Sequence, residues 1–277
     1  MIGTVTLADG TAVAALGQGT WRMGEDHRLR KREAGALRLG MDLGMTLIDT
    51  AEMYGDGAAE TLVGEAIAGQ RDGAFLVSKA YPQNASRDRL PRACEASLKR
   101  LGVDRLDLCL LHWRGSVPLG ETVEAMERLK AAGHIRHWGV SNLDADDMVE
   151  LIAAGGEGCA TDQILYNLVR RGPEHTLLPW LDRHAISTMA YSPVEQGALL
   201  RNAALATITA RLDATPAQVA LAWVMRRDGV IAIPKAGTVE HVLENRKAAD
   251  IDLSAADLAA LDASFPAPRT ARPLEML

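Results

Sequence analysis

The sequence predicts one α/β protein in which eight parallel strands close into a (β/α)8 TIM barrel with an N-terminal β-hairpin. Three observations support this. Short apolar segments alternate regularly with amphipathic ones, as parallel strands joined by helical crossovers do. The 277-residue length is close to the ~250 residues typical of one such barrel. Polar side chains follow nearly every apolar segment, where the strand ends of a barrel would meet.

The predicted elements follow in order along the chain. Residues 4–13 alternate around Asp9 and Gly10, a turn dipeptide typical of a hairpin. A first barrel strand is expected near Ala14–Gly17, and amphipathic helices are expected over 28–43 and 86–101. Gly44 and Gly102 follow these two helices as C-cap residues. The remaining strands are expected at 45–48, 74–77, 106–111, 138–140, 160–164, 187–190 and 230–233.

Two later helix starts carry capping signals. Thr215, with Pro at the next position and Gln218 three residues on, predicts a capping box, and Ser254 with Asp257 predicts another start. No linker divides residues 1–277, so we expect one domain, with 266–277 as a short tail near the active-site mouth. A doubly wound sheet is disfavoured because the closest match to its glycine-rich turn, at Gly17–Arg22, lacks the third glycine.

Composition restricts the partners. Hydrophobic residues make up 48% of the chain, enough for a substantial core, and the net charge of −6 argues against nucleic acid. No apolar run approaches the ~20 residues of a membrane span, and no signal peptide is visible. The three cysteines, Cys94, Cys109 and Cys159, show no metal-ligand spacing, as expected in a reducing cytosol. We therefore expect a cytoplasmic monomer with a small-molecule partner and no metal.

Four polar residues follow three successive strands. Asp49 and Tyr54 follow the strand at 45–48, Lys79 follows 74–77, and His112 follows 106–111. Taken singly, each has an ordinary structural explanation. Asp49 would be a strand-end cap and Tyr54 a loop tyrosine, while Lys79 would be a rim lysine and His112 a core histidine. Because barrel strands end on one face, the four should converge there. The Lys79 ammonium would lower the pKa of Tyr54 from its usual ~10, Asp49 would hold Lys79, and His112 would bind a substrate oxygen.

Such a site suits addition of hydride to a carbonyl, with Tyr54 as the proton donor. The hydride must come from a cofactor, since no side chain supplies one. One alternative is a barrel aldolase that uses Lys79 to form a Schiff base. Asp49 argues against it by keeping Lys79 charged.

Seven ordered segments resemble the aldo-keto reductase family, particularly its bacterial methylglyoxal reductase and diketogluconate reductase branch. They are 19–21, 49–55, 78–79, 110–113, 139–142, 191–193 and 233–235, and the resemblance runs to about Phe265. It implies a catalytic tetrad of Asp49, Tyr54, Lys79 and His112, and NADPH as cofactor. It also implies a substrate pocket lined by Trp21, Tyr54, His112 and Trp113.

The resemblance further implies the cofactor contacts. Ser141, Asn142 and Gln163 would hold the carboxamide, and Tyr191 would stack on the nicotinamide. Thr20, Asp49 and Ser192 would line the path of the ribose and phosphates, and Glu244 and Asn245 would meet the adenine. The whole implied set is Gly19, Thr20, Trp21, Asp49, Ser141, Asn142, Gln163, Tyr191, Ser192, Pro193, Lys235, Thr238, His241, Glu244 and Asn245.

The sequence departs from the family pattern at the 2′-phosphate. NADPH-preferring members follow the lysine at 235 with a serine and carry an arginine six residues after it, but this chain has Ala236 and His241. A largely neutral His241 cannot form an arginine fork, so we expect weaker phosphate binding and allow NADH as a second cofactor.

The short tail predicts an open mouth, which suits small aldehydes and ketoaldehydes resembling methylglyoxal, or diketo sugar acids. A second alternative to this reductase is a cofactor-binding regulatory protein on the same fold, since fold does not fix function.

Overall fold

The computed structural model describes the backbone of residues 1–277 and all side chains except those at 200, 201 and 203. Eight parallel strands form one sheet in the order β10-β9-β8-β7-β6-β5-β4-β3. Parallel bridges from Leu16 to Ala232 and from Gly19 to Lys235 join its two outer strands, which closes the sheet into the predicted (β/α)8 barrel. The strands are β3 (Gln18–Gly19), β4 (Leu47–Asp49), β5 (Phe75–Ala80), β6 (Leu106–Leu111), β7 (Ile135–Ser141), β8 (Cys159–Leu165), β9 (Ser187–Tyr191) and β10 (Val230–Ala232).

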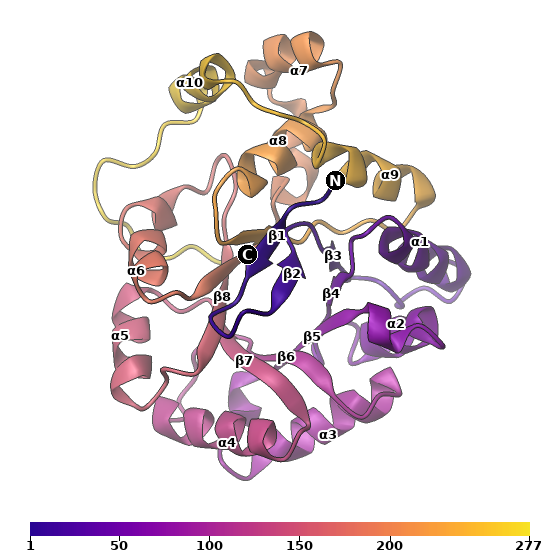
Figure 1. Cartoon of the computed structure of the whole chain (residues 1–277), viewed down its shortest axis with the longest axis vertical. Coiled ribbons are helices and arrows are strands. Elements are labelled where there is room, and N and C mark those ends of the chain that lie inside the picture. The colour runs from indigo at the N-terminus through magenta and orange to yellow at the C-terminus, as the bar shows by residue number, and fades with distance from the viewer.

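Helices surround this barrel (Figure 1). Eight of them are α1 (Arg30–Asp42), α2 (Ala58–Ile67), α3 (Arg89–Leu101), α4 (Leu119–Ala131), α5 (Ala145–Ala153), α6 (Leu177–Arg183), α8 (Pro216–Met225) and α9 (Val239–Ala248). Two more, α7 (Ala206–Leu212) and α10 (Ala255–Ser264), lie together at the top of Figure 1, outside α8 and α9. Short 3₁₀ turns occupy Arg71–Gly73, Pro82–Asn84, Gly172–Glu174, Glu195–Arg201 and Ala203–Leu205.

The N-terminal hairpin closes one end of the barrel. Strands β1 (Thr4–Thr6) and β2 (Ala12–Ala14) pair antiparallel, and Gly10 takes a φ of 87° in the turn between them. Val5, Leu7 and Val13 pack against apolar side chains inside the barrel. The expected position of the first barrel strand, near Ala14–Gly17, was wrong: Ala14 belongs to the hairpin, and the barrel strand is Gln18–Gly19.

The predicted helix ends are largely observed. Thr215 and Gln218 form a reciprocal capping box at α8, and Ser254 and Asp257 form one at α10. Gly102 ends α3 in the left-handed region, and Gly44 follows α1 with a φ of 90°. The helices α1 and α3 begin two and three residues later than the sequence predicts.

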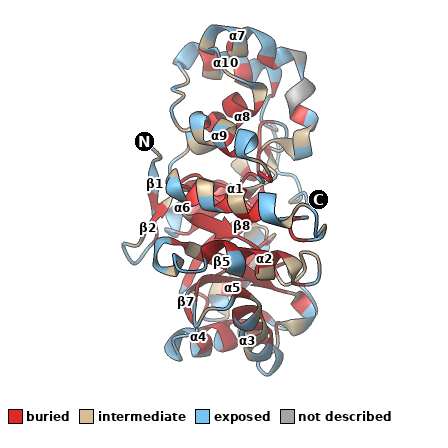
Figure 2. Ribbon diagram, turned by 90° about the vertical axis from the view of Figure 1, so that its right-hand side faces the viewer, coloured by how far each residue is buried: buried red, intermediate tan, exposed pale blue. Residues whose placement is uncertain are grey.

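Buried residues form two layers, one inside the barrel and a larger one between the sheet and the helices (Figure 2). None of the helices in the described structure is both long and apolar enough to cross a membrane. The C-terminal tail ends on the side of the barrel opposite the hairpin (Figure 2). Glu275 of this tail pairs with Arg170 at 2.6 Å, so the tail is fixed near the carboxyl ends of the strands.

Candidate active site

The carboxyl ends of three neighbouring strands bring the four predicted residues together. Asp49 ends β4, Lys79 is the penultimate residue of β5, and His112 directly follows β6. Tyr54 lies in the loop between β4 and α2. The parallel pairing of β4 with β5 and of β5 with β6 places all four at one end of the barrel, as the sequence predicts.

Lys79 is the centre of this group. Its side chain is fully buried, and Nζ donates to Asp49 Oδ2 at 2.8 Å, to the Thr50 carbonyl at 2.9 Å and to Tyr54 Oη at 3.1 Å. Burial lowers the pKa of Lys79, but the charges of Asp49 and Tyr54 outweigh burial and leave the pKa raised. The ammonium therefore stays protonated, with three acceptors for its three N–H groups.

Asp49 is held by residues of two other strands and by Thr20, which directly follows β3. Its Oδ2 accepts from Lys79 on β5, and its Oδ1 accepts from Gln163 Nε2 on β8 at 2.7 Å. The backbone carbonyl of Asp49 accepts from the N–H of Thr20 at 3.0 Å and from its hydroxyl at 2.9 Å. Because both carboxylate oxygens and the carbonyl have partners, Asp49 fixes the position of Lys79.

The pKa of Tyr54 differs from the expectation. Burial raises it, the Lys79 charge and hydrogen bond lower it, and Asp49 raises it again. The net shift of the Tyr54 pKa is upward, so the predicted lowering was wrong. Lys79 nevertheless lowers this pKa, as predicted. The cause is the desolvation of the buried phenolate, which residue spacing does not reveal.

His112 is neutral at physiological pH. Burial, followed by the nearby Lys79 charge, lowers its pKa to about 3. Its ring meets the Tyr54 ring edge-on, with centroids 5.8 Å apart. A neutral imidazole carries one N–H and one free acceptor nitrogen, so His112 can donate only one hydrogen bond into the site.

Aromatic rings extend the site outward from His112. Trp113 lies 4.9 Å from His112 and 5.8 Å from Tyr81, measured between ring centroids. The sequence analysis missed Tyr81, although its place two residues after Lys79, just past β5, was a usable signal. Trp21 is 40% exposed, and the guanidinium of Arg22 lies 4.6 Å from its ring centroid.

A polar network spans the ends of β7, β8 and β9. Ser141 donates to the Gln163 carbonyl at 2.8 Å, and Asn142 donates to Ser141 at 3.0 Å and to the His112 carbonyl at 3.1 Å. Tyr191 donates to Asn142 Oδ1 at 2.9 Å. Asn142 and Ser192 both have left-handed backbones, with φ of 61° and 48°. Four of the residues assigned to the nicotinamide, Ser141, Asn142, Gln163 and Tyr191, are therefore contiguous and adjoin His112.

The residues assigned to the adenosine end lie around the start of α9. Lys235 is exposed beside Gly19, Thr238 caps α9 by accepting from the His241 N–H, and His241 is exposed. Glu244 accepts from the Thr215 hydroxyl at 2.6 Å, and Asn245 is buried. This group is separate from the catalytic four but joined to them through Gly19, which bridges to Lys235 and pairs with Asp49.

The C-terminal tail reaches the polar network. The backbone N–H of Leu277 helps to lower the pKa of Tyr191, although burial is the largest cause and the net pKa is raised to about 12. The end of the tail therefore lies beside Tyr191.

The chain belongs to the aldo/keto reductase family, whose family model matches residues 15–265. It is 53% identical over 272 residues to methylglyoxal reductase YeaE of Escherichia coli K12, covering 96% of each chain. It is 34% identical over 261 residues to methylglyoxal reductase DkgB of Escherichia coli O157:H7, covering 91% of this chain and 94% of the relative.

Solved structures agree with this assignment. An aldo/keto reductase from Klebsiella pneumoniae, crystallised with NADP and acetate, superposes with a TM-score of 0.97 at 50% identity and full coverage of both chains. The same TM-score and identity are found for a complex with NADPH of an aldo-keto reductase from that organism. The family resemblance read from the sequence is confirmed.

Proposed function

We propose that this chain reduces small aldehydes and ketoaldehydes to alcohols, with hydride from NADPH and a proton from Tyr54. The observation that carries the proposal is the chain of contacts from Asp49 through Lys79 to the Tyr54 hydroxyl, beside a neutral His112. Family membership defines the chain as an NADPH-dependent oxidoreductase.

Tyr54 is the proton donor in this proposal. Its Oη gives a proton to the carbonyl oxygen as that oxygen gains negative charge, and the tyrosinate that remains accepts a hydrogen bond from Lys79 Nζ. The raised pKa of Tyr54 keeps it protonated and ready to donate. Lys79 limits the cost of the resulting phenolate, and Asp49 holds Lys79 in place.

His112 orients the substrate. Its neutral N–H donates to the carbonyl oxygen and stabilises the developing charge there, as fixed donors do in oxyanion sites. Neutral His112 also places no second full positive charge beside Lys79, so the ammonium remains the main electrostatic influence on Tyr54.

The chain has groups that fit the nicotinamide cofactor, whose chemistry is the supply of hydride. Asn142, Ser141 and Gln163 would hold the carboxamide, and the ring of Tyr191 would provide the stacking surface. The fit is supported by the continuous donor and acceptor network of these residues next to His112. Lys235 would bind the 2′-phosphate, since its side chain is exposed beside Gly19.

The substrate proposal rests on the side chains around the site and on the relatives. Trp113 and Tyr81 form an apolar wall, and the tail crosses near Tyr191. Such a site suits a small carbonyl compound with one polar end. Methylglyoxal is the first substrate to test, because two similar proteins are named methylglyoxal reductases.

The Schiff-base aldolase is disfavoured. A Schiff base requires a neutral lysine with an accessible lone pair. Lys79 is fully buried, its pKa is raised, and its three N–H groups already have three acceptors. Borohydride in the presence of substrate should therefore leave no adduct on Lys79.

Tyr54→Phe tests the proton donor. We expect loss of carbonyl reduction with NADPH affinity within about twofold of wild type, because only the hydroxyl that protonates the product is removed. Tyr166→Phe is the matched control, since its hydroxyl donates to Glu174 at 2.7 Å, on a different part of the molecule. Appreciable turnover by Tyr54→Phe would refute the role of Tyr54. A wild-type protein that binds NADPH but reduces no aldehyde would favour the regulatory alternative.

A further inference from the structure

Arg32 of α1 contacts the segment assigned to the cofactor phosphate. Its Nε donates to the carbonyl oxygen of Gly237 at 3.2 Å, across 205 positions of sequence. Gly237 lies between Lys235 and Thr238, in the loop that leads from β10 into α9. The helices α1 and α9 lie side by side at the right of Figure 1, so the contact joins neighbouring elements of the barrel.

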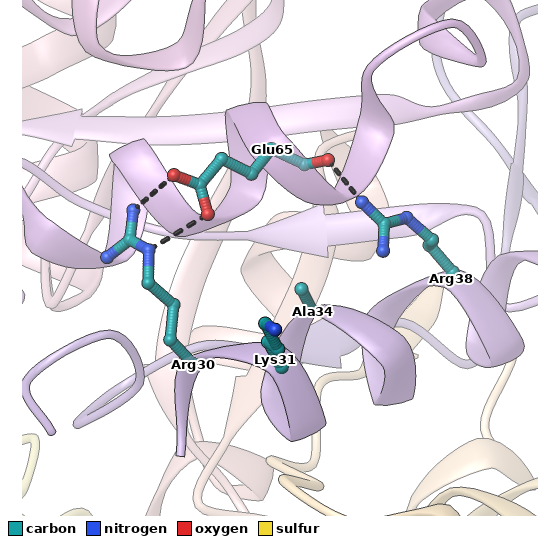
Figure 3. A pocket seen from close by; sticks show the side chains of 5 residues that line it. All are labelled: Arg30, Lys31, Ala34, Arg38 and Glu65. Atoms are coloured by element: carbon teal, nitrogen blue, oxygen red, sulfur yellow. Dashed lines mark hydrogen bonds and ion pairs between the residues drawn. The ribbon is translucent and has the colours of Figure 1, made fainter. Parts of the chain in front are cut away.

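Two other cations of α1, Arg30 and Arg38, already have partners on α2. Arg30 pairs with Glu65 of α2 at 2.8 Å, and Arg38 donates to the backbone carbonyl of Ala66 at 3.0 Å and to that of Glu65 at 2.6 Å. Figure 3 shows these side chains and Lys31 on the face of α1 that meets α2. Arg32 is exposed, and within the described side chains its two terminal nitrogens make no hydrogen bond or ion pair. The two terminal nitrogens of Arg32 are therefore available to bind a ligand.

Lys235 and Arg32 converge on Gly237. A Cβ placed on Gly237 would stand 3.5 Å from Lys235 Nζ, and Arg32 holds the carbonyl of the same residue. His241, the residue at the family's arginine position, is exposed on the first turn of α9. The pKa of Glu240 in that turn is lowered by its own backbone N–H and by Thr238 first, then by His241 and Arg32. The charge of Arg32 therefore acts on the Glu240 carboxylate at the start of α9.

Two carboxylates also lie in this region, Glu240 in the first turn of α9 and Glu33 of α1. Glu33 is buried, its Oε2 accepts from the Gly24 N–H at 2.9 Å, and its Oε1 would lie 3.7 Å from a Cβ on Gly237. With Glu33 present, Lys235 alone leaves little net positive charge around Gly237. A second cation is needed there to favour a dianionic phosphate over a hydroxyl group.

We propose that Arg32 supplies, from α1, the guanidinium that binds the 2′-phosphate of NADPH, in place of the arginine that the family pattern has at position 241. The inference rests on the cofactor assignment and not on the substrate or on the role of Tyr54. Arg32 and Lys235 then approach the phosphate from two elements, and the contact of Nε with Gly237 leaves the terminal nitrogens for the ligand. Arg32 is thus a specificity-determining residue for NADPH over NADH.

The test measures the affinity of the 277-residue protein for nucleotides by calorimetry. Arg32→Gln should weaken 2′,5′-ADP and NADPH about tenfold, the loss expected for one hydrogen bond between charged groups, and leave 5′-ADP and NADH within about twofold. Lys31→Gln is the matched control, with the same charge change one residue away on the α2 side, and should leave all four ligands unchanged. Adding His241→Arg to Arg32→Gln should restore the affinity for 2′,5′-ADP.

Two results would overturn the proposal. If Arg32→Gln weakened NADH and NADPH equally, Arg32 would act only by holding the Gly237 loop. If it weakened neither, Lys235 alone would bind the phosphate. Failure of carbonyl reduction would leave these binding results intact, so the proposed reaction and the role of Arg32 are tested separately.

Discussion

The buried, neutral His112 should make the protein less stable in mild acid. Its pKa is 6.5 in the unfolded chain and about 3 in the folded one, because burial and Lys79 disfavour the imidazolium. Below pH 6.5 the unfolded chain therefore binds a proton that the folded protein does not, and stability falls as the pH decreases. The loss from this residue grows by about 1.4 kcal/mol per pH unit and reaches about 2 kcal/mol at pH 5.

The His112→Asn variant isolates this effect. Urea unfolding, followed by circular dichroism, gives the free energy of unfolding of both proteins at about pH 7.5 and about pH 5. Wild type should lose about 2 kcal/mol more than the variant between the two pH values, whatever their difference at neutral pH. His137, whose pKa is also lowered chiefly by burial, titrates in both proteins and cancels in the comparison. An equal loss in the two proteins would refute the assignment of a buried neutral His112.

Three further predictions concern the buried ion pair, a strand contact and the cofactor. Lys79→Met should abolish turnover and cost about 3–5 kcal/mol of unfolding free energy by leaving Asp49 buried without its partner, and adding Asp49→Asn should recover stability but not activity. Gly139→Ala should lower the melting temperature, because a Cβ there would overlap the Thr161 carbonyl in the neighbouring strand. An unchanged melting temperature would show that β7 can shift. His241→Arg should tighten NADPH relative to NADH by about tenfold in a binding titration, and an unchanged ratio would contradict the placement of position 241 at the phosphate.

Much of the barrel was predictable because its signals are local. Alternation of apolar and polar segments, the capping boxes at Thr215 and Ser254, and the glycines after two helices each depend on a few adjacent residues. The first barrel strand was misplaced because it is only two residues long and follows a hairpin of similar composition. The 3₁₀ turns and α7 after β9 carry weak periodic signals, and the sequence analysis did not predict them.

The candidate site was predictable where strand ends determine position. Asp49, Lys79 and His112 follow consecutive strands, so their convergence follows from the barrel itself. The net pKa of Tyr54 depends on how deeply the ring is buried, and the contact of Arg32 with Gly237 depends on the packing of α1 beside α9. Neither property is encoded in residue spacing, so only the structure could supply them.

The most direct test of the central claim follows absorbance at about 340 nm with purified wild-type protein, methylglyoxal and NADPH. The account predicts NADPH oxidation that requires both protein and aldehyde, with formation of an equal amount of alcohol. NADPH that binds without being oxidised, across a panel of small aldehydes that includes methylglyoxal, would contradict it.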